Sequence, residues 1–206
     1  MNMPQLKLSY FDVNGGRAEP IRLAFHIGEV KFDDHRFGYE DFQEERKNTP
    51  LSQVPVLHVD GIQITQSNAI LRYAGKSAGL YPDDNYQALL CDEILDTIED
   101  CIDKIVPTLF LSGKEQKLAR ELLITKDLPK YLAFLEKKLI SQGGQWFSDN
   151  KLTIAELKLI ALINWLNSGG LEHIPQTLVE NIAPKLNEVQ KRVINLPEVI
   201  SYYASL

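Results

Sequence analysis

The spacing of apolar residues changes character once along this chain, and this change limits which folds the chain can adopt. Up to Tyr81, short segments with strand-like alternation are interspersed with segments that have helical spacing. A polar, turn-rich stretch from Pro82 to Asn85 follows, and every periodic segment beyond it has helical spacing. We therefore expect an α/β domain over residues 1–81, a linker over 82–86 and an all-helical domain over 87–206.

The first domain is predicted to contain four strands and three helices. The strands are expected at 5–11, 31–37, 54–59 and 62–64, and the helices at 18–26, 41–48 and 67–76. Asp60-Gly61 between the last two strands is a strong hairpin signal, and Gly28 is expected to end the first helix as its C′ residue. The order β-α-β, a helix or loop, then β-β-α predicts a thioredoxin-like sandwich with a mixed four-stranded sheet.

The second domain is predicted to be a bundle of helices. Apolar residues recur from Leu90 to Leu109 at spacings of three and four, which indicates a long helix that Pro107 should bend or end. Shorter helices are expected at 117–124, 128–140, 178–181, 184–194 and 197–203. Thr153-Ile154-Ala155-Glu156 is a capping box, with Leu152 and Leu157 placed as a hydrophobic staple. This box predicts the start of an apolar, central helix.

Composition and charge exclude several classes of function. The 206 residues are 44% apolar and 24% charged, which supports a buried core and argues against disorder. The net charge is −6, so we expect neither nucleic acid nor an anionic membrane as the main partner, because both need a concentrated basic face. The longest apolar stretch, Leu157 to Leu166, is interrupted by Lys158 and Asn164 and is too short to span a membrane.

Cysteine and histidine usage predicts a reduced compartment and no metal site. Only Cys91 and Cys101 are present, without a C-x-x-C motif, so neither a disulfide scaffold nor a dithiol redox site is expected. The four histidines show no ligand spacing. The segment from Met1 to Tyr10 has no charged leader followed by a long apolar run, and therefore does not resemble a signal peptide. Together these features predict a cytoplasmic protein.

Tyr10 is the first residue that could carry chemistry. It lies at the C-terminal end of the first predicted strand, just before the Asn14-Gly15-Gly16 turn, and this edge of an α/β sheet is where ligands bind. A hydroxyl there can donate a hydrogen bond to an anion such as a thiolate. Because a free thiol has a pKa of about 8.5, lowering it by about two units would ionise most of a bound thiol at neutral pH. The structural alternative is a tyrosine that packs at the core edge.

Two further segments have features suited to a peptide-like ligand. A cis bond at Val54-Pro55 would turn the backbone outward to pair with an added strand, although proline is also tolerated at a strand start for purely structural reasons. Gln66-Ser67 stands at a helix start, where N–H groups and a hydroxyl suit a carboxylate; a plain N-cap serine is the alternative. By themselves Phe42, Arg46 and Asp100 read as polar helix faces with one packing aromatic.

Taken together, these segments resemble the glutathione-binding domain of soluble glutathione transferases. The matching blocks are Ser9-Tyr10-Phe11, Gly16-Arg17-Ala18-Glu19, Gln53-Val54-Pro55-Val56-Leu57, Val59-Asp60-Gly61 and Gln66-Ser67-Asn68-Ala69-Ile70-Leu71-Arg72-Tyr73. The Thr153 to Glu156 box with Leu157-Lys158-Leu159 resembles the matching signal in their helical domain, so the resemblance covers essentially the whole chain. The Tyr-Phe start and the compact length are most similar to the sigma class.

The resemblance implies glutathione as co-substrate and no metal. Tyr10 would stabilise the glutathione thiolate, and Arg17 would support Tyr10 electrostatically. Val54, before a cis Pro55, would pair its backbone with the cysteinyl part of the tripeptide. The γ-glutamyl carboxylate would be held by Gln66 and Ser67.

Other implied contacts come from more distant positions. Gln53 and Arg46 would face the glycyl carboxylate, and Asp100 would reach across a homodimer interface to the γ-glutamyl amine. Three departures accompany these assignments. Phe42 stands where many relatives carry tryptophan, Arg46 stands where lysine is common, and the turn from Tyr10 to Arg17 is one residue longer than in close relatives.

The second substrate would lie between the two domains. The residues we expect to line its pocket are Phe11, Val13, Lys104, Ile105 and Leu109.

The implied activity is the addition of the glutathione thiolate to an electrophilic carbon, or its use on a hydroperoxide. A glutathione-dependent prostaglandin or steroid isomerase stays open as an alternative. So does a non-enzymatic carrier like the crystallins related to the sigma class, against which Tyr10 and Gln66-Ser67 argue. A thiol–disulfide oxidoreductase would need a cysteine near the first helix, and none occurs before Leu90.

Overall fold

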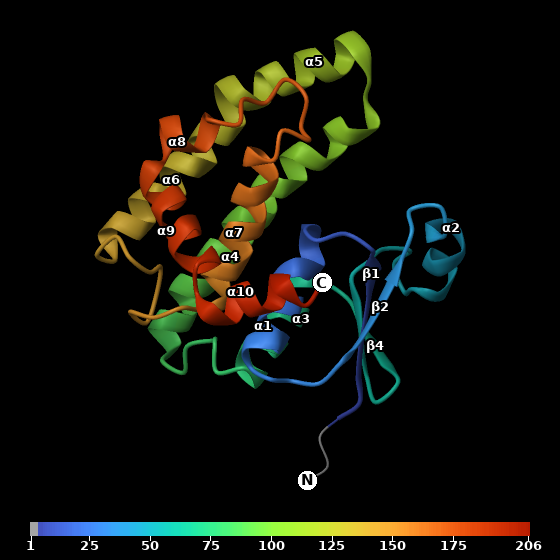
Figure 1. The fold of residues 1–206 in the computed structure, drawn as a ribbon. Helices are drawn as coiled ribbons and strands as arrows, with labels where there is room; N and C mark the ends of the chain where they lie inside the picture. The colour runs from blue at the N-terminus through green and yellow to red at the C-terminus, as the bar shows by residue number, and fades with distance from the viewer. Residues whose placement is uncertain (1–3) are drawn as a thin grey trace. The chain divides into compact units, whose positions relative to one another are not determined.

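The computed structural model describes residues 4–206, and the chain divides between Tyr81 and Pro82 into two compact units (Figure 1). The first unit contains the sheet, and the second contains helices alone within the described residues. Residues 1–3, which begin the segment read above as lacking a leader, lie outside the described residues. Over residues 4–206, no helix is both long enough and apolar enough to cross a membrane.

The first unit is built on one four-stranded sheet. Its strands are β1 (Leu6–Phe11), β2 (Asp33–Phe37), β3 (Val56–Val59) and β4 (Ile62–Ile64). Their spatial order is β2-β1-β3-β4; β1 is parallel to β2 and antiparallel to β3, and β3 is antiparallel to β4. This confirms the predicted mixed sheet. The predicted hairpin is also present, since Asp60 and Gly61 have the positive φ values of 49° and 84° that a tight two-residue turn demands.

Two helices cover one face of this sheet. They are α1 (Glu19–Ile27), which follows a 3-10 turn at Gly16–Ala18, and α3 (Ser67–Ser77) (Figure 1). α1 ends at Ile27 and Gly28 follows it as the expected helix-ending residue, although the positive φ of 52° falls on Glu29 and the φ of Gly28 is −82°. Gly28 is also required for packing, since a Cβ there would collide with Ala78 at the end of α3.

The third helix of this unit is shorter than expected. α2 covers only Phe42–Glu45, and a 3-10 turn, Arg46–Asn48, completes the segment predicted as helix over 41–48. Its side chains are polar and only Phe42 offers a large apolar group, so little burial is available to extend the helix.

The second unit is an all-helical bundle, as predicted. Its helices are α4 (Asn85–Ile105), α5 (Gly113–Leu122), α6 (Leu128–Ser141), α7 (Ile154–Asn167), α8 (Leu178–Ile182), α9 (Pro184–Ile194) and α10 (Pro197–Ala204). α4 begins two residues inside the segment assigned to the linker. The cause is Asp84, whose carboxylate accepts the backbone N–H groups of Tyr86 and Gln87 at 3.0 and 2.9 Å and caps the helix early.

Two prolines lie where helices of this bundle end or change their geometry. α4 ends at Ile105 and continues as a 3-10 turn, Val106–Phe110, that contains Pro107. The helices predicted at 117–124 and 128–140 are joined without a break by a π-helical turn, Leu123–Asp127. That widened turn precedes α6, whose second residue, Pro129, has no N–H group to donate to the preceding turn.

α7 is the central helix of the second unit. Every residue from Ile154 to Ile160 is buried, and the helix contacts both α4 and α9. The capping box is present: Thr153 Oγ1 accepts from the Ala155 N–H at 3.3 Å, and the Glu156 carboxylate accepts from the Thr153 N–H at 2.9 Å. Glu156 also accepts the Phe147 N–H at 2.8 Å. Burial raises the pKa of Glu156, and these hydrogen bonds oppose that rise.

Candidate functional site

Tyr10 is buried near the end of β1, and the turn that follows it closes over its hydroxyl. The Arg17 backbone N–H donates to Tyr10 Oη at 3.2 Å. Gly16, with a φ of 67°, makes this approach possible, because a Cβ there would lie 2.5 Å from the same oxygen. The lengthened turn therefore still delivers a hydrogen-bond donor to the phenol.

This arrangement sets what the Tyr10 hydroxyl can do. Burial raises the pKa of Tyr10, and the hydrogen bond and charge of Arg17 and the charge of Arg22 only partly oppose the rise. The phenol is therefore protonated at neutral pH. Since the Arg17 N–H occupies a lone pair of Oη, the O–H proton points elsewhere and is available to an anion.

Arg22 is the main residue that the sequence analysis missed. Its side chain is fully buried on α1, and its guanidinium lies 5.8 Å from the centroid of the Tyr10 ring. It donates to the carbonyl oxygens of Phe11 and Val13 at 3.3 and 2.9 Å and to Asp34 at 3.0 Å. Arg22 thus holds the backbone of the residues that follow Tyr10. Its only sequence signal is a charged residue within the apolar helix that follows Glu19-Pro20.

A second arginine holds the same turn from outside. Arg36, on β2, donates to Asp34 at 2.6 Å and to Asn14 at 3.0 Å, and its guanidinium lies 3.5 Å from Asp12. The loop after Tyr10 is therefore held from two sides, by α1 and by β2.

The predicted ligand segments meet at one edge of the sheet. Ser9 is paired with Val56 in the antiparallel β1–β3 register, which places Tyr10 level with Pro55. Leu57 is paired with Ile64, so Gln66, two residues beyond Ile64, comes to the same edge. The structure therefore brings together three segments that are far apart in the sequence.

Two of these segments have unusual backbone geometry. The Val54-Pro55 peptide bond is cis, as the resemblance implies; Pro55 is buried, Val54 is half-buried and Gln53 is exposed. Gln66, at the N-cap of α3, has φ 73° and ψ 106°. A positive φ at a residue other than glycine costs about 1–3 kcal/mol and is most often kept at functional sites. Ser67 follows as the first residue of α3.

An aromatic cluster lies beside Tyr10. The Phe11 ring stacks on Tyr39 with 4.6 Å between centroids and meets Phe42 edge-on at 5.0 Å. The guanidinium of Arg46 lies 5.4 Å from the centroid of the Phe42 ring. Phe42 thus packs as an aromatic between Phe11 and Arg46, but it offers no ring N–H donor.

The other predicted site residues lie in the turn after Tyr10 and in the second unit. Val13 is half-buried in the turn after Tyr10, and Asp100 and Lys104 are exposed on α4. Leu109 is 45% exposed in the 3-10 turn, whereas Ile105 is fully buried. Contact between Ile105 and a substrate would therefore require its side chain to be uncovered first.

The two cysteine thiols are unreactive at neutral pH. Cys91 and Cys101 are both buried, and burial raises the pKa of each to about 12, so hardly any thiolate is present at neutral pH. Among residues 4–206, no group of three or more histidine, cysteine, aspartate or glutamate side chains is placed to hold a metal ion.

Comparison with known proteins identifies the family. Residues 6–76 match the family model described as glutathione S-transferase, N-terminal domain, and residues 99–206 match glutathione S-transferase, C-terminal domain. The chain is 35% identical over 170 residues to glutathione S-transferase 1 of Ascaris suum, covering 79% of this chain and 81% of that protein.

Solved structures agree over almost the full length. The prostaglandin synthase D of Nilaparvata lugens has a TM-score of 0.86 at 29% identity, covering 98% of both chains. A sigma class transferase of Fasciola hepatica has a TM-score of 0.83 at 26% identity, covering 99% of this chain and 97% of its own. Both domains, the fold and the sequence identity lead to one conclusion: the chain belongs to the glutathione S-transferase family of transferase enzymes.

Proposed function

We propose that this protein activates glutathione through Tyr10 and transfers its thiolate to small electrophilic molecules. The observation that carries the proposal is the Tyr10 hydroxyl, whose oxygen accepts the Arg17 N–H at 3.2 Å while its proton stays available. That proton would donate to the sulfur of bound glutathione and favour the thiolate. A thiol has a pKa of about 8.5, so each unit of lowering gains about 1.4 kcal/mol in thiolate stability.

The proposed reaction is a nucleophilic attack by the sulfur of glutathione. The thiol releases its proton to solvent, and the sulfur lone pair forms a bond to an electrophilic carbon. In a substitution, the bond between this carbon and the leaving group breaks and its electron pair departs with that group; in an addition to a double bond, the displaced π pair is protonated by water. Tyr10 stays neutral throughout, since its raised pKa disfavours loss of its own proton. The Arg17 side chain adds a positive charge that further favours the thiolate.

Glutathione would lie along the sheet edge where the three segments meet. The Val54 backbone would pair with the cysteinyl residue, as an added strand pairs with an edge. Gln66 and Ser67 would hold the γ-glutamyl carboxylate at the start of α3, where helix N–H groups favour an anion. Gln53 and Arg46 would face the glycyl carboxylate, with Phe42 lining the site.

Several finer assignments complete the proposal. Asp100, exposed on α4, would meet the γ-glutamyl amine from a second copy of the chain, so the active form would be a homodimer. Phe11 and Val13 of the first unit and Lys104 and Leu109 of the second would contact the second substrate, and Ile105 would contact it once its side chain is uncovered. The sigma class likeness of one solved structure supports a sigma-type protein, and we assign it to the cytoplasm with a role in detoxification.

Tyr10→Phe tests the mechanism directly. Removing one donor to a developing anion typically lowers turnover about 10²- to 10³-fold, and we expect a loss of this size in conjugation of glutathione to a generic aromatic electrophile. Glutathione binding, measured by calorimetry, should change little. The matched control is Tyr39→Phe, which removes an exposed tyrosine hydroxyl from the neighbouring cluster and should retain turnover. Equal turnover in Tyr10→Phe and the parent would remove Tyr10 from the mechanism.

One comparison favours a second candidate. The structural neighbour from Nilaparvata lugens is a prostaglandin synthase, so glutathione-dependent isomerisation of a prostaglandin-type endoperoxide is the alternative. In that reaction glutathione is regenerated, whereas conjugation consumes it. Measuring glutathione consumed per product formed, with each substrate class, separates the two. Glutathione binding without either reaction would instead favour a carrier.

A further inference from the structure

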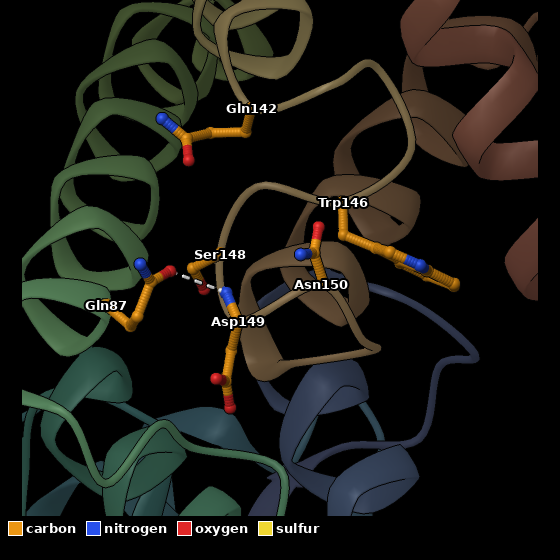
Figure 2. Close-up of a pocket in the computed structure, with 6 residues that line it drawn as sticks. All are labelled: Gln87, Gln142, Trp146, Ser148, Asp149 and Asn150. Carbon is orange, nitrogen blue, oxygen red and sulfur yellow. Dashed lines mark hydrogen bonds between the residues drawn. The ribbon is translucent and has the colours of Figure 1, made fainter.

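The second unit contains a polar pocket of about 190 Å³ between the first turns of α4 and the loop after α6 (Figure 2). There the Asp149 N–H donates to Gln87 Oε1 at 2.6 Å, drawn as a dashed line, and the Asp149 carboxylate pairs with Lys151 at 2.9 Å. The Ser148 hydroxyl oxygen is buried below the pocket surface, and the Trp146 ring points away from the other side chains. The charged groups of the first unit, by contrast, form one connected cluster beside its reactive hydroxyl.

Asp34, on β2, is the centre of that cluster. Its Oδ1 accepts from Arg22 Nε at 3.0 Å, and its Oδ2 accepts from Arg36 Nε at 2.6 Å. Within residues 4–206, the Asp34 carboxylate has no other hydrogen-bond partner. It is 24% exposed, whereas the Arg22 side chain is fully buried. The two oxygens of one carboxylate are thus occupied by donors from two different elements, α1 and β2.

Each of these arginines extends from Asp34 to the turn that follows Tyr10. Arg22 donates to two backbone carbonyl oxygens there, at 2.9 and 3.3 Å, and Arg36 donates to Asn14 Oδ1 at 3.0 Å. One carboxylate therefore holds both of the groups that fix this turn. An amide could not do the same, because it has one acceptor oxygen and its NH₂ group would face a guanidinium donor.

The cluster also determines the charge near the reactive oxygen. The Arg22 guanidinium lies 5.8 Å from the centroid of the Tyr10 ring, and Arg36 is the Cα partner of Tyr10 in the β1–β2 register. Burial raises the pKa of Tyr10, and the charge of Arg22 is among the influences that oppose this rise, so that charge is felt at the hydroxyl. Asp34 places a negative charge against both arginines and reduces the positive potential that they create there.

Two further carboxylates border the cluster. Glu19, on α1, lies 3.9 Å from Arg22 Nη1, and Asp12, in the turn, lies 3.5 Å from Arg36 Nη1. Both distances exceed the 3.0 and 2.6 Å that separate Asp34 from the same arginines. Asp34 is therefore closer to each arginine than the carboxylate that borders it.

We propose that Asp34 is a positioning residue for the activation of glutathione: its carboxylate holds both arginines around the turn after Tyr10, offsets their charge, and thereby sets the pH at which bound glutathione ionises. The inference rests on the proposed function, since it concerns the thiol that Tyr10 activates. A positive charge close to a thiolate lowers the pKa of the thiol, and a negative charge raises it. Asp34 therefore keeps this pKa above the value that the arginines alone would give.

The pH dependence of conjugation at saturating glutathione tests the proposal. The midpoint of the kcat/KM profile for the electrophile reports ionisation in the enzyme–glutathione complex, and the ultraviolet absorption of the bound thiolate gives the same midpoint without turnover. We expect Asp34→Asn to lower the midpoint by about half a unit and Arg36→Met to raise it by about as much. The first variant removes a negative charge near the thiol, and the second removes a positive one.

Asp33→Asn is the matched control, because it makes the same change of charge one residue earlier on β2. The Asp33 side chain is exposed, points to the opposite face of the sheet, and has no ion pair or hydrogen bond to the described part of the chain. Solvent and salt screen its charge. The midpoint of this variant should equal that of the parent.

A purely structural role for Asp34 would give a different result. Loss of the hold on the turn would lower the maximal rate in both Asp34→Asn and Arg36→Met without moving their midpoints in opposite directions. Midpoints that stay at the parent value, or that move in the same direction, would overturn the proposal. Arg36 is 19% exposed, so Arg36→Met should fold even where Asp34→Asn does not, and an unchanged midpoint in Arg36→Met alone would also overturn it.

The thiolate absorption of Tyr10→Phe separates this inference from the proposed function. Loss of the Tyr10 proton donor should raise the midpoint of the bound thiol. If Tyr10→Phe keeps the parent midpoint, the proposed function fails. If its midpoint rises while Asp34→Asn and Arg36→Met keep the parent value, only the role of Asp34 fails.

Discussion

In each unit of this protein, a fully buried charged side chain is bonded to the backbone of a loop: Arg22 in the first unit and Glu156 in the second. These two side chains are called anchors below, and they bind opposite kinds of backbone group. In the first unit, Arg22 donates to the carbonyl oxygens of the loop after Tyr10. In the second unit, Glu156 accepts the N–H groups of Phe147 and Thr153, at the two ends of the loop before α7. One anchor binds carbonyl groups and the other binds N–H groups.

The difference lies in how each buried charge is tolerated. A guanidinium cannot lose its proton in a protein, so Arg22 needs carboxylates, and it has Asp34 at 3.0 Å and Glu19 at 3.9 Å. A carboxyl group can take up a proton, and burial raises the pKa of Glu156 accordingly. The first unit therefore requires an ion network around its anchor, whereas the second requires only a local hydrogen-bond pattern.

Removing the arginine anchor should have the largest effect. Arg22→Met leaves two backbone carbonyl groups without their donor and removes one of the two arginines paired with Asp34, so we expect a loss of about 3–5 kcal/mol in the free energy of unfolding. Turnover should fall with it, because the loop carrying the Arg17 N–H is released. Both tryptophans lie in the second unit, so in urea the far-UV circular dichroism should change before tryptophan emission does.

The matched control for this variant is Arg36→Met. Arg36 holds the same loop, but its side chain is 19% exposed, so we expect a loss of only about 1 kcal/mol. Equal destabilisation by the two arginine substitutions would mean that burial does not distinguish them, and the comparison of anchors would fail.

Removing the glutamate anchor should have a somewhat smaller effect. Glu156→Ala leaves the N–H groups of Phe147 and Thr153 without their acceptor in the core, which should cost about 2–4 kcal/mol. Thr153→Ala, which removes only the side-chain cap, should cost about 1–2 kcal/mol. Urea unfolding followed by tryptophan emission measures both. A larger loss in Thr153→Ala would show that the cap, not the carboxylate, holds the loop.

The two anchors also predict different responses to pH. A carboxyl group with a raised pKa binds its proton more tightly in the folded state, so its contribution to stability is present below the ordinary value of 4.5 and is lost as the pH rises toward the folded-state pKa. The stability of the parent relative to Glu156→Gln should therefore fall as the pH rises above 4.5. Parallel stability curves for the two proteins would contradict this.

Thiol labelling should show the smallest effect, and it uses the two cysteines that the chain already carries. Both cysteines lie in the second unit with pKa values of about 12, so at pH 8 a thiol reagent should label neither until that unit opens. Cys91 Sγ contacts Thr153 Oγ1 at 3.9 Å, which places it beside the Glu156 anchor. Labelling should be faster in Glu156→Ala and unchanged in Arg22→Met; acceleration in both would show that the anchors are coupled.

The same comparison explains what the sequence could and could not predict. Thr153 and Glu156 are three residues apart, and their contact is a recurring local pattern, so the central helix was predictable from sequence spacing. The hairpin at Asp60-Gly61 and the alternation of the strands are likewise local, and they were sufficient for the sheet. Resemblance to a family supplied the cis bond at Val54-Pro55, which spacing alone would have made improbable.

Arg22 could not be found in the same way, because its partners lie 9, 11 and 12 positions away in sequence. A charged residue in an apolar helix has no local signature that tells a buried anchor from an exposed side chain. The packing role of Gly28 could not be predicted for a related reason, since the residue that a Cβ there would collide with is Ala78, which is distant in the sequence.

The hydrogen bond from Arg17 to Tyr10 has one more consequence, which concerns how the protein tolerates variation over evolutionary time. The donor is a backbone N–H, a group that nineteen of the twenty amino acids supply equally. Position 17 can therefore exchange its side chain, and with it the local charge, without altering the orientation of the phenol. Among substitutions, proline alone would delete the donor. Substitutions at position 17 can therefore change the charge near Tyr10 while the hydrogen bond that orients its hydroxyl stays the same.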